Sequence, residues 1–444
     1  MRNSLIELEI TGLTHEGKGV GRHDGLAVFV KGALPGELVK ISLDKTKKSY
    51  AEGTLKEIIV VSPHRVRPLC ASYIKCGGCQ LLHLKYEEQL VEKTKIVANA
   101  LERIGGFSYI KVNQCIGMIE PWGYRNKIIF QVGPGNLLGF FEGSSNEFVP
   151  GKDCLLVSSN LRVLANELER LINVCGLDKL KRVLIRESTF SGEFLLGLIF
   201  ADDSHDRLQI NKLVEEVKGL FPKVVSIVEF VTPDPKVSWK GKSNILHGKG
   251  YFLEKVGGKK FIVSVNSFFQ VNSLQTEKLY ECVINFAKSN TATNGGIIFD
   301  LYSGTGTITI FLSEIAGKVY GIESLEEAVK DARENVSLND VKNVGFILGK
   351  AEIEAKNLVD GGIKPDIIVV DPPRNGCHQA LLDTIIVVKP EKVVYVSCNP
   401  ATLARDLKIL SECYTVEEVQ PVDMFPHTAH VEVVCFLSSK AKGF

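Results

Sequence analysis

The feature that most constrains the fold is a regular alternation of apolar strands and amphipathic helices, which begins near residue 261. In chain order we expect a strand at 296–301, a helix at 308–315, a strand at 318–322, a helix at 325–339, and strands at 344–348, 367–370 and 393–397. Strands that alternate with helices in this way form a parallel sheet covered by helices on both faces. The sequence therefore predicts a helix-covered α/β domain over residues 263–444.

The first 60 residues have a different texture, in which short segments of alternating apolar and polar residues are separated by glycine-rich turns. This pattern is typical of a small all-β barrel. Residues 61–262 mix cysteines, basic residues, several strands and one amphipathic helix expected at about 86–104, which could pack on the last domain. Their pattern alone does not specify a fold. We therefore expect three domains, at 1–60, 61–262 and 263–444, which suits a chain of 444 residues.

Composition places the chain among ordinary globular proteins, with 45% apolar and 24% charged residues. It has no uninterrupted apolar run of about 18 residues, and its first residues lack the apolar core of a signal peptide, so we expect a cytoplasmic protein. Eleven cysteines without an export signal predict reduced thiols, some of them ligands or nucleophiles. The net charge of +1 predicts no partner, but residues 61–130 hold ten Lys and Arg against five Asp and Glu, an excess that could meet phosphates.

A cysteine stands where the strand at 393–397 gives way to a helix, in the sequence Ser397-Cys398-Asn399-Pro400. Asn399 can cap that helix, and Pro400 suits its first position. A helix N-terminus stabilises an anion and lowers the pKa of a nearby thiol. Cys398 is therefore a candidate nucleophile, with a small apolar residue filling a strand end as the alternative.

A second motif indicates a nucleoside cofactor. Asp300 lies in the first strand of the α/β domain, Gly304 and Gly306 follow in the turn, and Glu323 comes 23 residues after Asp300, next to the second strand. Close backbone approach at the glycines and a carboxylate for ribose hydroxyls suit such a cofactor. A dinucleotide fingerprint would place a third glycine where Thr309 stands. Because S-adenosyl-L-methionine carries no pyrophosphate, the motif favours it over NAD.

A rigid loop follows the strand at 367–370, in the sequence Asp371-Pro372-Pro373-Arg374. It falls at the carboxyl edge of the expected sheet, where ligands bind in open α/β folds. Two prolines stiffen the loop and fix the Asp371 carboxylate toward the crevice. Methyltransferases that act on amino groups often carry an aromatic residue after Pro-Pro, so Arg374 disfavours an amino-group target.

Three cysteines within ten residues, Cys70, Cys76 and Cys79, form a ligand-like cluster. The candidates for a fourth ligand are Cys115, Cys154 and Cys175. Spacing does not choose among these candidates. Four thiolates suit either a tetrahedral zinc ion or an iron–sulfur cluster.

These motifs together resemble those of the RNA 5-methyluridine methyltransferases, which use adenosylmethionine. The resemblance covers essentially the whole chain and is carried by the segments Phe269–Asn272, Asp300–Gly306, Asp371–Arg374, Ser397–Pro400 and Asp423–Glu432. Residues 1–60, including Gly12–Gly21, resemble a TRAM domain, an RNA-binding OB-like barrel.

The resemblance implies a Rossmann-like α/β methyltransferase domain, an N-terminal OB-like TRAM barrel and a central α+β RNA-binding domain. It implies that Cys398 is the nucleophile and Glu432 the general base. The cofactor-binding positions that it implies are Gln270, Tyr302, Thr307, Glu323 and Asp371. It also points to a [4Fe-4S] cluster on Cys70, Cys76, Cys79 and Cys154, with zinc as the alternative metal.

The expected reaction is methylation of uridine C5 in RNA. Addition of a thiolate to C6 turns the uracil ring into an enolate whose C5 can attack a methyl group, and a carboxylate then removes the C5 proton. We expect 23S rRNA as the substrate, because of the TRAM-like segment, and the tRNA T-loop as the second choice. A cytosine-C5 enzyme is disfavoured because Arg374, not a cysteine, follows Pro373. An RNA-binding protein with an inactive methyltransferase domain is disfavoured because Cys398 and Glu432 are both retained.

Overall fold

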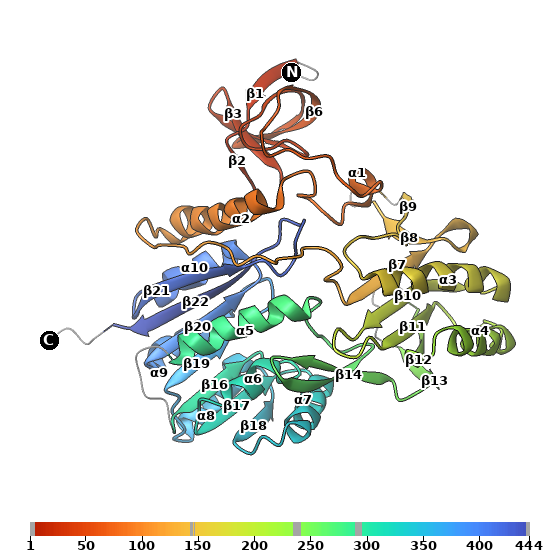
Figure 1. Cartoon of the computed structure of the whole chain (residues 1–444). Helices are drawn as coiled ribbons and strands as arrows, with labels where there is room; N and C mark the ends of the chain where they lie inside the picture. Colours follow the sequence, from red (N-terminus) through yellow and green to blue (C-terminus); the bar gives the residue numbers. More distant parts are fainter. Residues whose placement is uncertain (1–4, 143–144, 146, 234–240, 289–294, 441–444) are drawn as a thin grey trace.

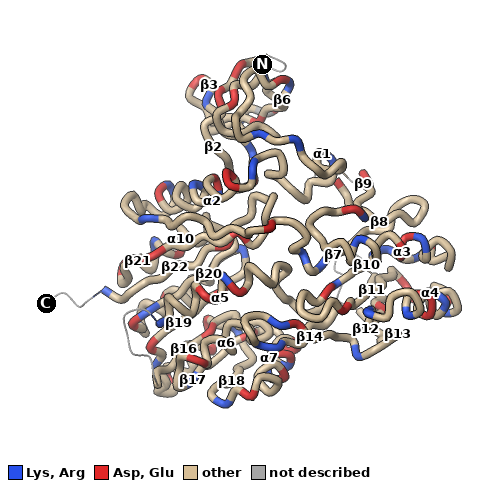
Figure 2. Tube along the Cα trace, viewed as in Figure 1, with Lys and Arg blue, Asp and Glu red and all other residues tan. Residues whose placement is uncertain are grey.

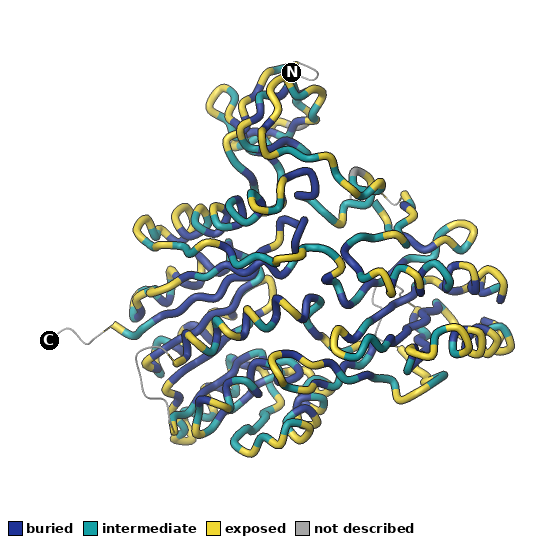
Figure 3. Tube along the Cα trace, viewed as in Figure 1, coloured by how far each residue is buried: buried dark blue, intermediate teal, exposed yellow. Residues whose placement is uncertain are grey.

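The structure is a computed structural model, and it describes residues 5–142, 145, 147–233, 241–288 and 295–440. Figure 1 shows three units: a small β unit at the N-terminus, a central unit built on one sheet, and a C-terminal unit built on a second sheet. Figure 3 shows buried residues concentrated along the strands of both sheets, whereas exposed residues follow the outer helices. None of the helices in the described segments combines the length and apolar character needed to cross a bilayer.

The N-terminal unit contains strands only, as predicted. They are β1 (Leu5–Glu9), β2 (Gly12–Leu13), β3 (Gly19–His23), β4 (Leu26–Val30), β5 (Leu38–Thr46) and β6 (Tyr50–Val60). They join in the order β1-β5-β6-β4-β3-β2 around a small apolar core. The buried carboxylate of Glu37 accepts a hydrogen bond from Arg65 Nε at 2.6 Å, which ties this unit to the segment that follows it.

The central unit begins with a cysteine-bearing loop and the predicted amphipathic helix. The helices are α1 (Tyr73–Cys76), α2 (Tyr86–Ala100), the π-helix η1 (Leu101–Gly105), the 3₁₀-helix η2 (Pro134–Asn136), α3 (Ser159–Cys175) and α4 (Arg207–Leu220). The strands are β7 (Lys127–Val132), β8 (Leu138–Phe141), β9 (Phe148–Pro150), β10 (Leu180–Glu187), β11 (Phe194–Phe200), β12 (Val224–Val231) and β13 (Lys242–His247). The sheet order is β13-β12-β11-β10-β7-β8-β9, and the apolar faces of α3 and α4 pack on it.

The C-terminal unit follows the predicted alternation. Its strands are β14 (Tyr251–Val256), β15 (Lys259–Ser264), β16 (Ile297–Leu301), β17 (Lys318–Glu323), β18 (Val344–Leu348), β19 (Ile367–Val370), β20 (Lys392–Ser397), β21 (Tyr414–Val422) and β22 (Glu432–Ser439). Its helices are α5 (Ser273–Lys288), α6 (Thr307–Leu312), α7 (Glu326–Leu338), α8 (Ala351–Asp360), α9 (Gln379–Val388) and α10 (Pro400–Leu410).

The main sheet of this unit has the order β18-β17-β16-β19-β20-β22-β21. Strands β16 to β20 are parallel, whereas β22 runs antiparallel to β20 and forms a hairpin with β21. One face packs against α5 and α6, and the other packs against α8, α9 and α10. The prediction of a parallel sheet covered on both faces is therefore confirmed.

Two elements that begin before residue 263 pack on this sheet. Helix α2 contributes Val97 to the same apolar core as Leu403 and Leu407 of α10, and Figure 1 shows the two helices side by side. The β14–β15 hairpin contributes Phe252 and Phe261 to the core on the opposite face. Helix α2 thus shares a core with α10, in line with the expectation for the helix at about 86–104, and the domain boundary at 263 stays a prediction.

Candidate active site

A cavity of about 1120 Å³ opens at the carboxyl edge of the main sheet. It lies where β16, β17, β19 and β20 end, the position at which open parallel sheets bind ligands. The predicted site residues that line this cavity are Gln270, Tyr302, Glu323, Asp371, Cys398 and Glu432. The structure thus brings together residues that are up to 162 positions apart, between Gln270 and Glu432.

Cys398 lies between the end of β20 and the first turn of α10. The predicted cap is present, because Asn399 Oδ1 accepts a hydrogen bond from the Ala401 N–H at 3.0 Å. Asn399 Nδ2 also donates to the carbonyl oxygen of Arg374 at 3.1 Å, which fixes the thiol loop against the Asp371–Arg374 loop.

The pKa of the Cys398 thiol is raised to about 11, not lowered as its place at a helix N-terminus predicted. Burial is the largest cause, and the nearby carboxyl groups of Glu432 and Asp371 raise the pKa further. The Arg374 guanidinium opposes them. Desolvation and two like charges outweigh the partial positive charge of one helix end.

Glu432 is the first residue of β22 and is 6% exposed. Burial raises the pKa of its carboxyl well above the usual range, and Asp371 adds to that effect while Arg374 opposes it. A buried carboxyl group that interacts with a thiol can accept and return protons.

Two further carboxyl groups have raised pKa values. Burial raises the pKa of Asp371, which follows β19, to about 7. It also raises the pKa of Asp300 to about 7, although the Thr309 hydroxyl donates to Asp300 Oδ2. Asp300 Oδ1 has no hydrogen-bonding partner among the described residues. This concentration of buried acids favours a cationic ligand in the adjacent cavity.

Glu323 connects the loops that follow β16 and β17. Its Oε2 accepts the Gly304 N–H at 3.0 Å, and its Oε1 accepts the Leu325 N–H at 2.8 Å. Tyr302, with a φ of 65°, begins the turn and lines both the main cavity and a neighbouring cavity of about 570 Å³. Gly306 is required in this turn because its φ is 76° and a Cβ atom would lie 2.7 Å from the Phe346 ring.

Thr307 is not brought to the cavity. Its hydroxyl accepts a hydrogen bond from the Tyr280 hydroxyl at 2.9 Å at the start of α6. Thr305, which lies two residues before Thr307 and directly follows Gly304, lines the cavity instead. The prediction of Thr307 as a cofactor contact stays a prediction.

Cationic and aromatic side chains border the same cavity. Arg125 and Arg374 line it together with Phe268, Phe425 and His430. Sequence reasoning missed Phe268, whose 73% exposure contrasts with the 6% exposure of its neighbour Phe269. The signal was available as two consecutive aromatic residues beside Gln270, because adjacent side chains in an extended segment point in opposite directions.

A smaller cavity of about 340 Å³ adjoins Cys398 on the side of the N-terminal unit. Arg374, Cys398 and His430 line it together with His15 and Glu16 of the loop between β2 and β3. In Figure 2, Lys and Arg are interspersed with Asp and Glu over all three units. The N-terminal unit therefore reaches the cavity beside Cys398 through the loop between β2 and β3.

The predicted metal ligands gather between the loop around α1 and the segment after β9. Burial raises the pKa of Cys79 to about 12, and Cys154, Cys76 and Cys70 raise it further, so the four thiols interact. The alternatives Cys115 and Cys175 are buried in two separate apolar cores. Among the described residues, however, no group of three or more Cys, His, Asp or Glu side chains is arranged to hold a metal ion. The four predicted cysteines interact electrostatically, but a formed metal site is not supported, and the ligand set stays a prediction.

Comparison with known proteins gives consistent matches over the chain. Residues 237–440 match the family described as tRNA (Uracil-5-)-methyltransferase, and residues 1–56 match the TRAM domain. An uncharacterized RNA methyltransferase of Bacillus cereus is 40% identical and covers 99% of this chain and 98% of its own length. An uncharacterized RNA methyltransferase of Halalkalibacterium halodurans is 41% identical, and the match covers 99% of this chain and 98% of that protein.

A solved structure also matches over nearly the full length. The crystal structure of Pyrococcus abyssi tRNA (uracil-54, C5)-methyltransferase in complex with S-adenosyl-L-homocysteine superposes with a TM-score of 0.75 and 27% sequence identity. The match covers 97% of this chain and 100% of that chain.

Proposed function

Because the chain belongs to the adenosylmethionine-dependent RNA uracil-5-methyltransferase family and carries a TRAM domain, we propose that Cys398 and Glu432 perform the reaction on a uridine. The observation that carries this proposal is the interaction of a thiol and a buried carboxyl group in one cavity at the carboxyl edge of the sheet. Both groups have raised pKa values, as expected of an acid–base pair that exchanges protons.

The first role of the site is to add a nucleophile to the ring. Cys398 gives up its proton to a neighbouring carboxylate, and its sulfur bonds to C6 of uracil, which makes C5 nucleophilic. Bound adenosylmethionine supplies an electrophilic methyl group on a sulfonium. When ionised, Asp371 and Glu432, which line the same cavity, would stabilise that positive charge, and the rigid Pro372-Pro373 segment keeps Asp371 in place.

The second role is to restore the ring. Glu432 removes the proton from methylated C5, and the electron pair left behind expels the Cys398 sulfur from C6. The site has then received two protons, one from the Cys398 thiol and one from C5. One of them returns to the released thiolate and the other is lost to solvent, which restores the starting protonation. We propose that Gln270, Tyr302, Glu323 and Asp371 hold the cofactor, with Thr305 and not Thr307 in the turn.

We propose 23S rRNA as the substrate, with the tRNA T-loop as the alternative. The TRAM domain supports an RNA target of either kind. The Pyrococcus abyssi tRNA enzyme, which matches over 97% of this chain, supports the alternative. Mass mapping of 5-methyluridine in rRNA and tRNA from a deletion strain separates the two. Loss from 23S rRNA alone supports the proposal, and loss from tRNA alone assigns the alternative.

The [4Fe-4S] cluster remains a proposal that rests on the four interacting thiols. The methylation itself is redox neutral, so no step requires the cluster. An ordering role for the loop that carries Cys70, Cys76 and Cys79 is consistent with the Ser72 hydroxyl, which donates to the Pro150 carbonyl oxygen at 3.2 Å.

The covalent step is tested with RNA that contains 5-fluorouridine. Fluorine does not leave C5 as a cation, so the wild type should form an adduct that survives denaturation, and Cys398→Ala should form none. Cys413→Ala is a matched control that should leave the adduct unchanged. Cys413 precedes Tyr414, which pairs with Ser439 at the end of β22 opposite Glu432. Absence of an adduct with both 23S rRNA and tRNA substrates would refute the covalent mechanism.

A further inference from the structure

The loop between β21 and β22, residues 423–431, carries side chains into the active-site cavity. Phe425 and His430 line the cavity, and Glu432 follows directly as the first residue of β22. Glu432 pairs across the hairpin with Val422, so both ends of the loop are fixed next to the proposed base. The loop contains His427 in a left-handed conformation, with a φ of 67°. Its shape therefore depends on contacts made by other elements.

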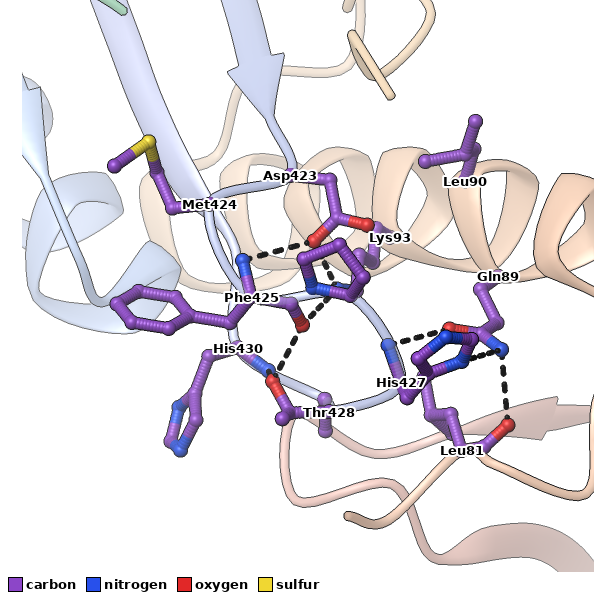
Figure 4. Close-up of polar contacts among 12 residues, drawn as sticks. Leu81, Gln89, Leu90, Lys93, Asp423, Met424, Phe425, His427, Thr428 and His430 are labelled. Carbon is purple, nitrogen blue, oxygen red and sulfur yellow. Dashed lines mark hydrogen bonds and ion pairs between the residues drawn. The ribbon is translucent and has the colours of Figure 1, made fainter. Parts of the chain in front are cut away.

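The first contact is a buried ion pair between the loop and helix α2. Lys93 Nζ donates to Asp423 Oδ1 at 2.5 Å and to the Phe425 carbonyl oxygen at 3.1 Å (Figure 4). Neither side chain of the pair is exposed. Tyr86 lies one helix turn before Gln89 on α2, and its hydroxyl donates to Asp423 Oδ2 at 2.9 Å. The pair therefore joins a helix outside the methyltransferase domain to the start of the loop.

The second contact holds the middle of the loop. Gln89 Oε1 accepts the His427 N–H at 2.9 Å, and Gln89 Nε2 donates to the Leu81 and Leu84 carbonyl oxygens at 3.1 and 2.8 Å. The Leu81 N–H in turn donates to the His427 carbonyl oxygen at 3.0 Å. Figure 4 shows Gln89 between the loop and Leu81. The side-chain amide of Gln89 thus hydrogen-bonds to the backbone of His427 in the loop and to the backbone of Leu81 and Leu84.

We propose that Lys93 and Gln89 are positioning residues that place Glu432 for proton removal, an inference that rests on the proposed function. Proton transfer needs the carboxylate within hydrogen-bonding reach of C5, and a misplacement of about 1 Å can cost roughly 100-fold in rate. Cys398 is held separately, by its own cap and by the Arg374 loop. Loosening α2 from the loop therefore slows proton removal and release of the sulfur more than it slows thiol addition and methyl transfer.

The two halves are measured separately with Lys93→Met and Gln89→Leu. Adduct formation on 5-fluorouridine RNA reports thiol addition and methyl transfer, and its final amplitude counts the folded, competent enzyme. Turnover of ordinary RNA, normalised to that amplitude, also requires proton removal and release of the sulfur. Lys95→Met is the matched control, because it makes the same substitution on the same helix. Lys95 pairs with Glu92 within α2 and not with the loop.

We expect both variants to keep the rate of adduct formation within about threefold of wild type while normalised turnover falls at least tenfold. Methylated covalent complex should then accumulate on ordinary RNA, and Lys95→Met should show neither effect. A proportional loss of both rates, or normal turnover per competent enzyme, would overturn the positioning role. If Lys93→Met does not fold, Gln89→Leu, which leaves the ion pair intact, decides the question. Absence of any wild-type adduct would instead refute the proposed function itself.

Discussion

The raised pKa of Asp371 predicts a strong pH dependence of cofactor affinity. The cofactor carries a positive sulfonium, which attracts the ionised carboxylate and gains little from the protonated form. Because burial raises the pKa of Asp371 to about 7, acidification from pH 8 to pH 5.5 protonates most of this carboxyl group. Protonation therefore competes with binding of the cation, and affinity should rise with pH until the carboxyl group is ionised.

The magnitude follows from the protonated fraction. With a pKa of about 7, the protonated form outnumbers the ionised form by roughly 30 to 1 at pH 5.5, so affinity should fall about 30-fold from pH 8. Glu432, whose pKa is also raised by burial, acts in the same direction.

The assay is equilibrium binding of adenosylmethionine and of S-adenosylhomocysteine to the full chain between pH 5.5 and 8. S-adenosylhomocysteine keeps the same amino, carboxyl and adenosine groups but has a neutral thioether, so its affinity should vary much less. Asp371→Asn should bring the adenosylmethionine curve toward that of the neutral ligand. Equal pH dependence for both ligands in the wild type would refute the reasoning, provided that circular dichroism is unchanged over this range.

Three other predictions concern Glu432, Asp300 and the predicted cysteine ligands. Glu432→Gln should accumulate methylated covalent complex on ordinary RNA, visible as a shifted band in a denaturing gel; normal turnover would require another base. Asp300→Asn should remove part of the pH dependence of stability, because the raised pKa of Asp300 means that the folded state holds its proton more tightly than the unfolded state. Wild type should therefore lose up to ~3 kcal/mol more than the variant between pH 5 and pH 8 in urea unfolding, and equal losses would contradict this. Anaerobically purified protein should contain about four iron atoms per chain and absorb visible light. Cys154→Ser should lower both, whereas zinc in place of iron would favour the alternative metal.

The alternation of strands and helices in the C-terminal unit could be predicted because its signals are local, although α5, α8, α9 and the β14–β15 hairpin were not predicted. Periods of 2.0 and 3.6 residues, interrupted by glycine and proline, define strands and helices without knowledge of their neighbours. The Asn399 cap was predictable for the same reason, since its partner Ala401 is two residues away. The strand order of the central sheet could not be predicted, because β7 pairs with β10 across more than 40 intervening residues that contain a helix.

The pKa of Cys398, the proposed nucleophile, shows where local reasoning fails. The helix N-terminus beside Cys398 is a local feature, and alone it would lower the pKa of the thiol. Burial, Glu432 and Asp371 raise it instead, and they depend on how β19, β20 and β22 come together. A sequence motif can thus single out a candidate nucleophile while giving the wrong direction for its pKa.

Helix α2 contained a long-range signal that its pattern could have revealed. Gln89, Lys93 and Val97 are spaced four apart and so share one stripe of the helix, and all three are fully buried. A lysine on a buried stripe requires an anionic partner, because an unpaired buried charge is strongly destabilising. The pattern therefore indicated that an acid elsewhere in the chain meets this helix. It did not indicate which acid, because Asp423 is 330 residues away and only the folded hairpin brings it to Lys93.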